Sequence, residues 1–167
     1  MIHDIEFKEV MGAVCSPVTV ITTLTPDGRP HGTTVSSFAS LSMEPPMVSF
    51  ALDRGSELLR HLHESGRAGI NLLSHGQESL AVTFARRGAD KFEDVRWRVE
   101  SGVPRLHGDG GWIAVTVDNF VAGGDHEMIL ARVDEAESSS SFPLVYARRT
   151  FGTHSRFEQA MDAPSAS

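Results

Sequence analysis

The chain has 167 residues, 40% of them hydrophobic and 22% charged, which is typical of one globular domain and too short for two well-cored ones. Fifteen Lys and Arg against 22 Asp and Glu give a formal net charge of −7, which repels phosphate backbones and argues against nucleic-acid binding. No apolar run approaches the roughly twenty residues that cross a bilayer, and residues 1–8 mix acids and bases, unlike a signal peptide. We therefore expect a cytoplasmic protein with no membrane attachment.

The N-terminal third predicts a helix followed by a β-hairpin. Apolar residues within 5–14 recur near helical spacing, and Pro17 ends that helix. Residues 18–25 are mostly β-branched, as in a strand with at least one buried face. The Pro-Asp-Gly sequence at 26–28 favours a turn, so a second strand should begin at Pro30 and pair with the first.

The middle of the chain alternates strands with short helices. Residues 47–52 and 68–73 read as strands, while Leu residues on one face of 56–65 predict a helix that Gly66 ends. A further short helix is expected over residues 78–84.

The C-terminal half predicts more strands. Apolar and charged residues alternate over 95–99, which indicates a half-exposed strand. Residues 112–121 predict a long strand, joined by a turn at 123–124 to a partner over 128–133, and residues 144–146 predict a last strand.

These elements amount to six to eight strands and two or three short helices. The strand–helix alternation over 47–73 is compatible with a parallel α/β sheet, but the hairpin turns and short helices favour an antiparallel barrel with peripheral helices. Residues 158–167 are small and polar, so we expect a disordered tail after a single domain over residues 1–157.

Several kinds of catalytic site are absent from the sequence. There is no G-x-S-x-G nucleophile turn and no Gly-Lys dipeptide for a phosphate-binding loop. Cys15, the only cysteine, rules out an internal disulfide and is expected to be buried and unreactive. Among the eight histidines, His61 and His63 are two residues apart on a predicted helix and so point to different sides. We expect no metal site.

The most informative segment is residues 32–46, GTTVSSFASLSMEPP. Six hydroxyl side chains fall within eleven positions of it, interleaved with apolar residues. This density suits a flat ligand that must be hydrogen-bonded along its edge. An edge strand whose hydroxyls bond only to nearby backbone explains the composition equally well.

The stretch over 33–46 resembles the signature of the flavin reductase-like family, the FMN-binding split-barrel reductases of two-component monooxygenases. Three further segments match that family's motifs in the same order. Residues 85–92 resemble its F-A-x…D-K-F element, 124–126 its G-D-H motif, and 143–152 its closing P-L-x-Y…F-G strand. The resemblance covers residues 5–155 and implies a mainly β, antiparallel Greek-key split barrel with a few peripheral α-helices.

The resemblance also implies which residues hold the flavin. The isoalloxazine ring and ribityl chain are expected against the segment Thr33, Thr34, Val35, Ser36 and Ser37. Ser42 matches the family's second serine, near the pyrimidine edge or the phosphate. Where relatives carry Asn-Arg/Lys-x-Ser for the phosphate, this chain has Asp53, Arg54 and Ser56. The carboxylates of Asp53 and Glu57 should weaken phosphate binding, which suits a flavin that exchanges as a substrate.

Further site residues follow from the same resemblance. The flavin is expected to contact a second group of side chains: Asn71, Phe84, Arg86, Lys91 and Tyr146. Phe84 and Tyr146 are also explained as core residues, and Lys91 as a solvated surface lysine. His126 is expected near the nicotinamide, where its imidazole can donate a hydrogen bond to the carboxamide or to a diphosphate oxygen. The alternative is that His126 is an ordinary histidine in a turn and binds no ligand.

Three functions remain open on the sequence. The first is an NAD(P)H:flavin oxidoreductase that transfers a hydride from NADH or NADPH to FMN or FAD and supplies reduced flavin to a partner monooxygenase. The resemblance implies that such a protein is a homodimer. The second is an electron carrier with tightly bound FMN and no NAD(P)H oxidation, and the third is a barrel that uses this surface only for subunit contact.

Overall fold

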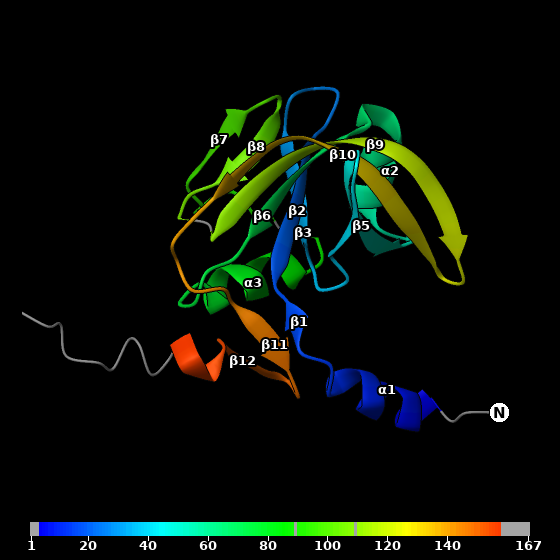
Figure 1. Ribbon diagram of the computed structural model, residues 1–167. Coiled ribbons are helices and arrows are strands. Elements are labelled where there is room, and N and C mark those ends of the chain that lie inside the picture. Colours follow the sequence, from blue (N-terminus) through cyan, green and yellow to red (C-terminus); the bar gives the residue numbers. More distant parts are fainter. Residues whose placement is uncertain (1–3, 89, 109, 158–167) are drawn as a thin grey trace, which may run out of the picture.

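The computed structural model describes residues 4–88, 90–108 and 110–157 (Figure 1). Its centre is a curved seven-stranded sheet in the order β3-β2-β6-β9-β10-β5-β4, with every neighbouring pair antiparallel. The strands are β2 (Thr19–Leu24), β3 (Pro30–Val35), β4 (Ala39–Met43), β5 (Pro46–Asp53), β6 (Arg67–Leu72), β9 (Gly111–Gly123) and β10 (His126–Ser138). The predicted mainly β, antiparallel architecture is confirmed.

The sheet forms a barrel that strand pairing leaves open, because β3 and β4 are its two edges. Where β3 and β5 come close without pairing as strands, a side chain makes the hydrogen bonds that connect them. The hydroxyl of Ser37, just after β3, accepts a 2.9 Å hydrogen bond from the Ala51 amide on β5 and donates to the Ala51 carbonyl at 3.2 Å. The end of β3 is therefore tied to β5, and the rest of β3 keeps one backbone edge without a strand partner.

Three helices accompany the sheet: α1 (Asp4–Gly12), α2 (Glu57–Ser65) and α3 (Glu78–Ala85). The predicted leucine face of α2 is buried in the barrel, with Leu58, Leu59 and Leu62 packed among the inward side chains of the strands. As expected, α2 ends at Gly66, whose φ of 64° is the left-handed conformation that glycine adopts without strain.

A second core lies outside the barrel, between β2, α3 and two small sheets. Phe84 of α3 is fully buried there and meets Phe92 edge-on, with ring centroids 4.9 Å apart. One small sheet has the order β1-β11-β12, and the other is the β7–β8 hairpin. Their bounds are β1 (Ser16–Pro17), β11 (Val145–Ala147), β12 (Thr150–Gly152), β7 (Trp97–Glu100) and β8 (Val103–Leu106).

The structure departs from the sequence prediction in several places. Strands β1, β4 and β8 were not predicted, because β1 has only two residues, β4 is almost wholly exposed, and β8 contains Pro104. Cys15 is exposed, contrary to expectation, because it follows α1, in which no residue is buried. The predicted tail, 158–167, lies outside the described residues. No helix in the described part of the chain has the length and apolar character needed to cross a membrane.

Candidate functional site

A cleft of about 1560 Å³ runs along β3, between α2 on one side and the segment that follows α3 on the other. Ten of the fifteen predicted site residues line it: Thr33, Thr34, Val35, Ser36, Ser37, Asp53, Ser56, Arg86, Lys91 and His126. These residues come from five separate parts of the chain. The fold therefore gathers most of the residues that the sequence motifs singled out around one opening.

The threonine hydroxyls of β3 join this strand to α3. Thr34 donates to the carbonyl of Ala81 at 2.6 Å, and Thr33 donates to the carbonyl of Phe84 at 3.3 Å. Both hydroxyl protons are thus engaged within the protein, and each oxygen keeps acceptor capacity only. Val35 points into the barrel core, whereas Ser36 is exposed on the cleft wall.

The start of α2 forms one side of the cleft. Ser56 occupies the N-cap position, yet its hydroxyl makes no capping hydrogen bond. The first amides of a helix have no partner within the helix and attract negative groups. Next to it, the carboxylate of Asp53 accepts a 2.7 Å hydrogen bond from the Gly55 amide, so part of its charge is already satisfied by backbone.

His126 lines the cleft as the first residue of β10, directly opposite Asp53 of β5. Its Nδ1 is 2.8 Å from the Asp125 carboxylate, and this hydrogen bond holds the pKa of Asp125 below its usual range. If Nδ1 donates to that carboxylate, Nε2 remains as the second hydrogen-bonding atom of the ring. The side chain is 45% exposed, so it is accessible to a ligand.

Lys91 closes the opposite wall. Its Nζ donates to the carbonyls of Gly32 and Phe84 at 3.0 and 2.9 Å, and burial of the amine lowers the pKa of Lys91. This lysine therefore links β3 to the end of α3 instead of being a freely solvated surface residue. Nearby, Arg86 and Arg87 are exposed and form no ion pair with any residue in the described ranges.

The chain is similar to known proteins of one family. The family model described as "Flavin reductase like domain" matches residues 11–155. The chain belongs to the flavin reductase-like family. The recognition made from four sequence motifs is therefore confirmed.

Three curated relatives in this family carry informative names. The chain is 36% identical over 156 residues to the reductase component of 4-nitrophenol 4-monooxygenase/4-nitrocatechol 2-monooxygenase of Rhodococcus opacus, covering 93% of this chain and 84% of the relative. It is 37% identical over 153 residues to the flavin reductase (NADH) of Kitasatospora aureofaciens, covering 87% and 78%. A probable flavin reductase of Rhizobium meliloti is 34% identical over 147 residues, covering 87% of this chain. The match spans only 47% of that relative's length.

A solved structure of the flavin reductase PheA2 superposes on this chain with a TM-score of 0.85 at 27% identity, covering 92% of this chain and 99% of that one. The family's split-barrel fold is thus reproduced over nearly the whole domain.

Five predicted site residues of this family member lie outside the cleft lining. Asn71 is fully buried, where its amide donates to the Val20 carbonyl and its oxygen accepts from the Leu106 amide. Phe84 belongs to the second core, and Tyr146 packs against Phe151 in the small sheet. The remaining two are Ser42, which lies on β4 and pairs with Met47 of β5, and Arg54, which lies in the loop before α2.

Other cleft residues were not proposed as site residues from the sequence. His31 of β3 and His61 of α2 both line the cleft, and their rings are in tilted contact with centroids 5.1 Å apart. Arg60 and Arg87 also line the opening. No motif marked them, since a histidine in a strand or an arginine in a helix has no local pattern that distinguishes a site from a surface.

Proposed function

We propose that this chain is an NAD(P)H:flavin oxidoreductase, which transfers a hydride from NADH or NADPH to FMN or FAD and releases reduced flavin to a partner monooxygenase. The observation that carries the proposal is the cleft along β3, where ten of the fifteen predicted site residues meet. Membership of the flavin reductase-like family and the names of the curated relatives support it. The requirement for NAD(P)H favours the cytoplasm as its compartment.

The dimensions and donors of the cleft fit such ligands. Its volume of about 1560 Å³ exceeds the roughly 300–1,000 Å³ of a site for one small molecule, so there is room for a flavin and a nicotinamide together. The free edge of β3 offers backbone groups to a flat heterocycle. The uncommitted hydroxyl of Ser56 and the first amides of α2 suit a phosphate.

The chemistry belongs to the cofactors: when bound, the flavin accepts the hydride that the reduced nicotinamide gives up. The protein's part is to bind and align. Ser36 and the β3 backbone border the ring, Ser56 and Arg86 serve the phosphate groups, and His126 donates a hydrogen bond to the nicotinamide carboxamide or the diphosphate. Because alignment of the two cofactors alone supplies much of the rate enhancement of hydride transfer, no catalytic dyad is needed.

The flavin is proposed to exchange as a substrate. Three carboxylates line the side of the cleft nearest α2, those of Asp53, Glu57 and Glu64. Glu57 is the first residue of α2 and Asp53 lies shortly before it, so both carboxylates repel a phosphate bound at the start of that helix. Weak phosphate binding allows the reduced flavin to leave by diffusion, as a reductase that serves a separate oxygenase requires.

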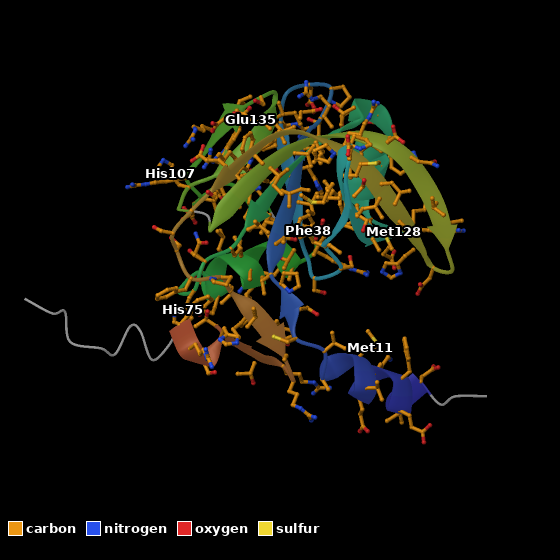
Figure 2. All side chains as sticks on the ribbon, in the orientation of Figure 1. Met11, Phe38, His75, His107, Met128 and Glu135 are labelled. Atoms are coloured by element: carbon orange, nitrogen blue, oxygen red, sulfur yellow. The ribbon has the colours of Figure 1, made fainter. Side chains whose placement is uncertain are left out.

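We further propose that the protein works as a homodimer. Helix α1 has no buried residue. An apolar stripe, formed by Phe7, Val10 and Met11 on the helix and Val14 just after it, is between 48% and 65% exposed. Figure 2 shows the side chains of α1, Met11 among them, projecting from a helix that lies away from the barrel. An apolar stripe at helical spacing stays exposed only at a cost, and a second copy would cover it.

A steady-state assay tests the enzymatic proposal. Purified chain is mixed with each pair of FMN or FAD with NADH or NADPH, and nicotinamide oxidation and flavin bleaching are followed without oxygen. Saturable bleaching in at least one pair is expected and also assigns the preferred cofactors. A tightly bound yellow flavin that is inert to both nicotinamides would indicate the electron carrier instead. Absence of flavin affinity would indicate a barrel used for subunit contact.

A further inference from the structure

A histidine–glutamate pair lies inside the cleft, beside the start of α2. The Nε2 atom of His31 on β3 is 3.4 Å from Oε2 of Glu57, the first residue of that helix. Their side chains are 23% and 73% exposed, and both residues line the cleft. The other ring nitrogen of His31, Nδ1, is buried and has no hydrogen-bond partner in the described part of the chain. Among the described residues, Glu57 is therefore the one hydrogen-bonding partner of this imidazole.

Glu57 occupies the place where an anion binds best. It directly follows Ser56, the N-cap, so its carboxylate lies in the first turn of α2, near the partial positive charge of the helix N-terminus. Under the proposed function this is the phosphate end of the cleft. A bound flavin phosphate and the Glu57 carboxylate then compete for the same positive potential and repel each other.

The surroundings of His31 make its charge responsive to a bound anion. Burial lowers the pKa of His31, and the neighbouring His61 of α2 and Lys91 after α3 lower it further, while Glu57 opposes this effect. The guanidinium of Arg60 is 3.0 Å from Nε2 of His61, so a further cation lies beside the His31–His61 contact. Near neutral pH the imidazole of the free protein is accordingly uncharged, and an added phosphate dianion favours its protonation.

We infer that His31 and Glu57 together regulate the affinity of the cleft for the phosphate of its ligand, with the imidazole taking a proton from solvent as the phosphate binds and thereby compensating the Glu57 carboxylate. This inference rests on the proposed function, since it assumes that a flavin phosphate enters at the start of α2. It assigns to a non-motif residue, His31, the role of a specificity residue for phosphorylated flavins.

The test compares FMN with riboflavin, which has the same ring and ribityl chain but no phosphate. Dissociation constants are measured from pH 5.5 to 8.5 for the wild type, His31→Asn and Glu57→Gln. A matched pair of control variants is available in His63→Asn and Glu127→Gln, because His63 and Glu127 form a 2.9 Å pair that does not line the cleft. The phosphate's own titration, near pH 6, is common to all variants and cancels in the comparison.

At pH 8, Glu57→Gln should bind FMN about three- to tenfold more tightly than the wild type, with no change for riboflavin. At pH 6, His31→Asn should bind FMN more weakly by a similar factor. Titration calorimetry near pH 7 in buffers of different ionisation enthalpy should show proton uptake on FMN binding by the wild type and less uptake by His31→Asn. The two control variants should match the wild type in every measurement.

Two results overturn the inference, and they are distinguishable. If the wild type binds neither flavin, the proposed function fails and the inference fails with it. If the wild type binds both flavins, but the ratio of FMN to riboflavin affinity is the same in Glu57→Gln and the wild type at every pH, the proposed function stands and the inference alone is wrong. Variants that fail to fold are detected by circular dichroism. In that case Glu57→Asp is used, which keeps the charge but holds it farther from His31. Proton uptake on FMN binding should be lower in Glu57→Asp than in the wild type, and equal uptake would contradict the inference.

Discussion

The hydroxyl of Thr34 on β3 donates a 2.6 Å hydrogen bond to the carbonyl of Ala81 on α3. This bond fixes the floor of the cleft to one of its walls, because β3 is an edge strand and has no second strand to hold it. Part of the hydroxyl-rich segment thus builds the cleft instead of contacting the ligand directly.

Thr34→Val, which removes the hydroxyl at nearly constant volume, should lower the free energy of unfolding by about 1 kcal/mol. It should also weaken flavin binding, since α3 is less firmly held against β3. Urea unfolding and flavin fluorescence quenching measure the two effects. Thr150→Val is a suitable control, because the Thr150 hydroxyl makes only an exposed 3.4 Å contact with the Arg148 carbonyl. Unchanged flavin affinity in a destabilised Thr34→Val would show that the bond is structural only.

His126→Ala should raise the KM for the nicotinamide nucleotide more than it raises the dissociation constant of the flavin. The reason is that His126 reaches the cleft from β10, opposite Asp53 and beside Asp125, and is not part of the β3 segment that borders the ring. Steady-state kinetics at saturating flavin, together with a separate flavin titration, make the comparison. A KM equal to that of the wild type would remove His126 from the nicotinamide site.

The stability of the ligand-free protein should depend on pH through His31. Burial lowers the pKa of His31 in the folded state, so below about pH 6.5, the usual histidine value, the unfolded chain binds more protons than the folded one. Stability should therefore fall as the pH falls through this range. The loss between pH 7 and 5.5 should be smaller in His31→Asn, as measured by urea midpoints. An identical loss in both proteins would contradict the burial of a neutral imidazole.

Substitution within the α1 stripe should dissociate the homodimer. Val10→Glu places a charge in the centre of the stripe, whose members are at least 48% exposed in the single chain. Light scattering after size-exclusion chromatography should report a dimer for the wild type and a monomer for Val10→Glu. Lys8→Gln, which leaves the stripe intact, should remain dimeric. A monomeric wild type would refute the homodimer proposal.

Much of the fold could be predicted from local patterns. The β-branched run of β2, the Pro-Asp-Gly turn and the leucine face of α2 each agree with the structure, because burial of a continuous apolar face decides the local conformation. The unpredicted β8 is buried at all four positions despite its Pro and Arg. There tertiary packing determines the strand: Pro104 approaches β6 so closely that a Cβ at Gly69 would lie 2.8 Å from its carbonyl oxygen.

The site was predictable only where family motifs marked it. Thr33 to Ser37, Ser56, Lys91 and His126 come together in the cleft, although the sequence alone could not show that the threonine hydroxyls point to α3. Asn71 carries a polar side chain in a buried strand, and its hydrogen bonds to Val20 and Leu106 explain it without a ligand.

The central claim is that the cleft along β3 holds the flavin, and a crystal structure of the chain soaked with FMN tests it most directly. The isoalloxazine ring should lie against β3 near Ser36, with the phosphate at Ser56 and one ring face open toward His126. Flavin bound elsewhere on the protein, in crystals of an active enzyme whose β3 cleft contains only water, would contradict the claim.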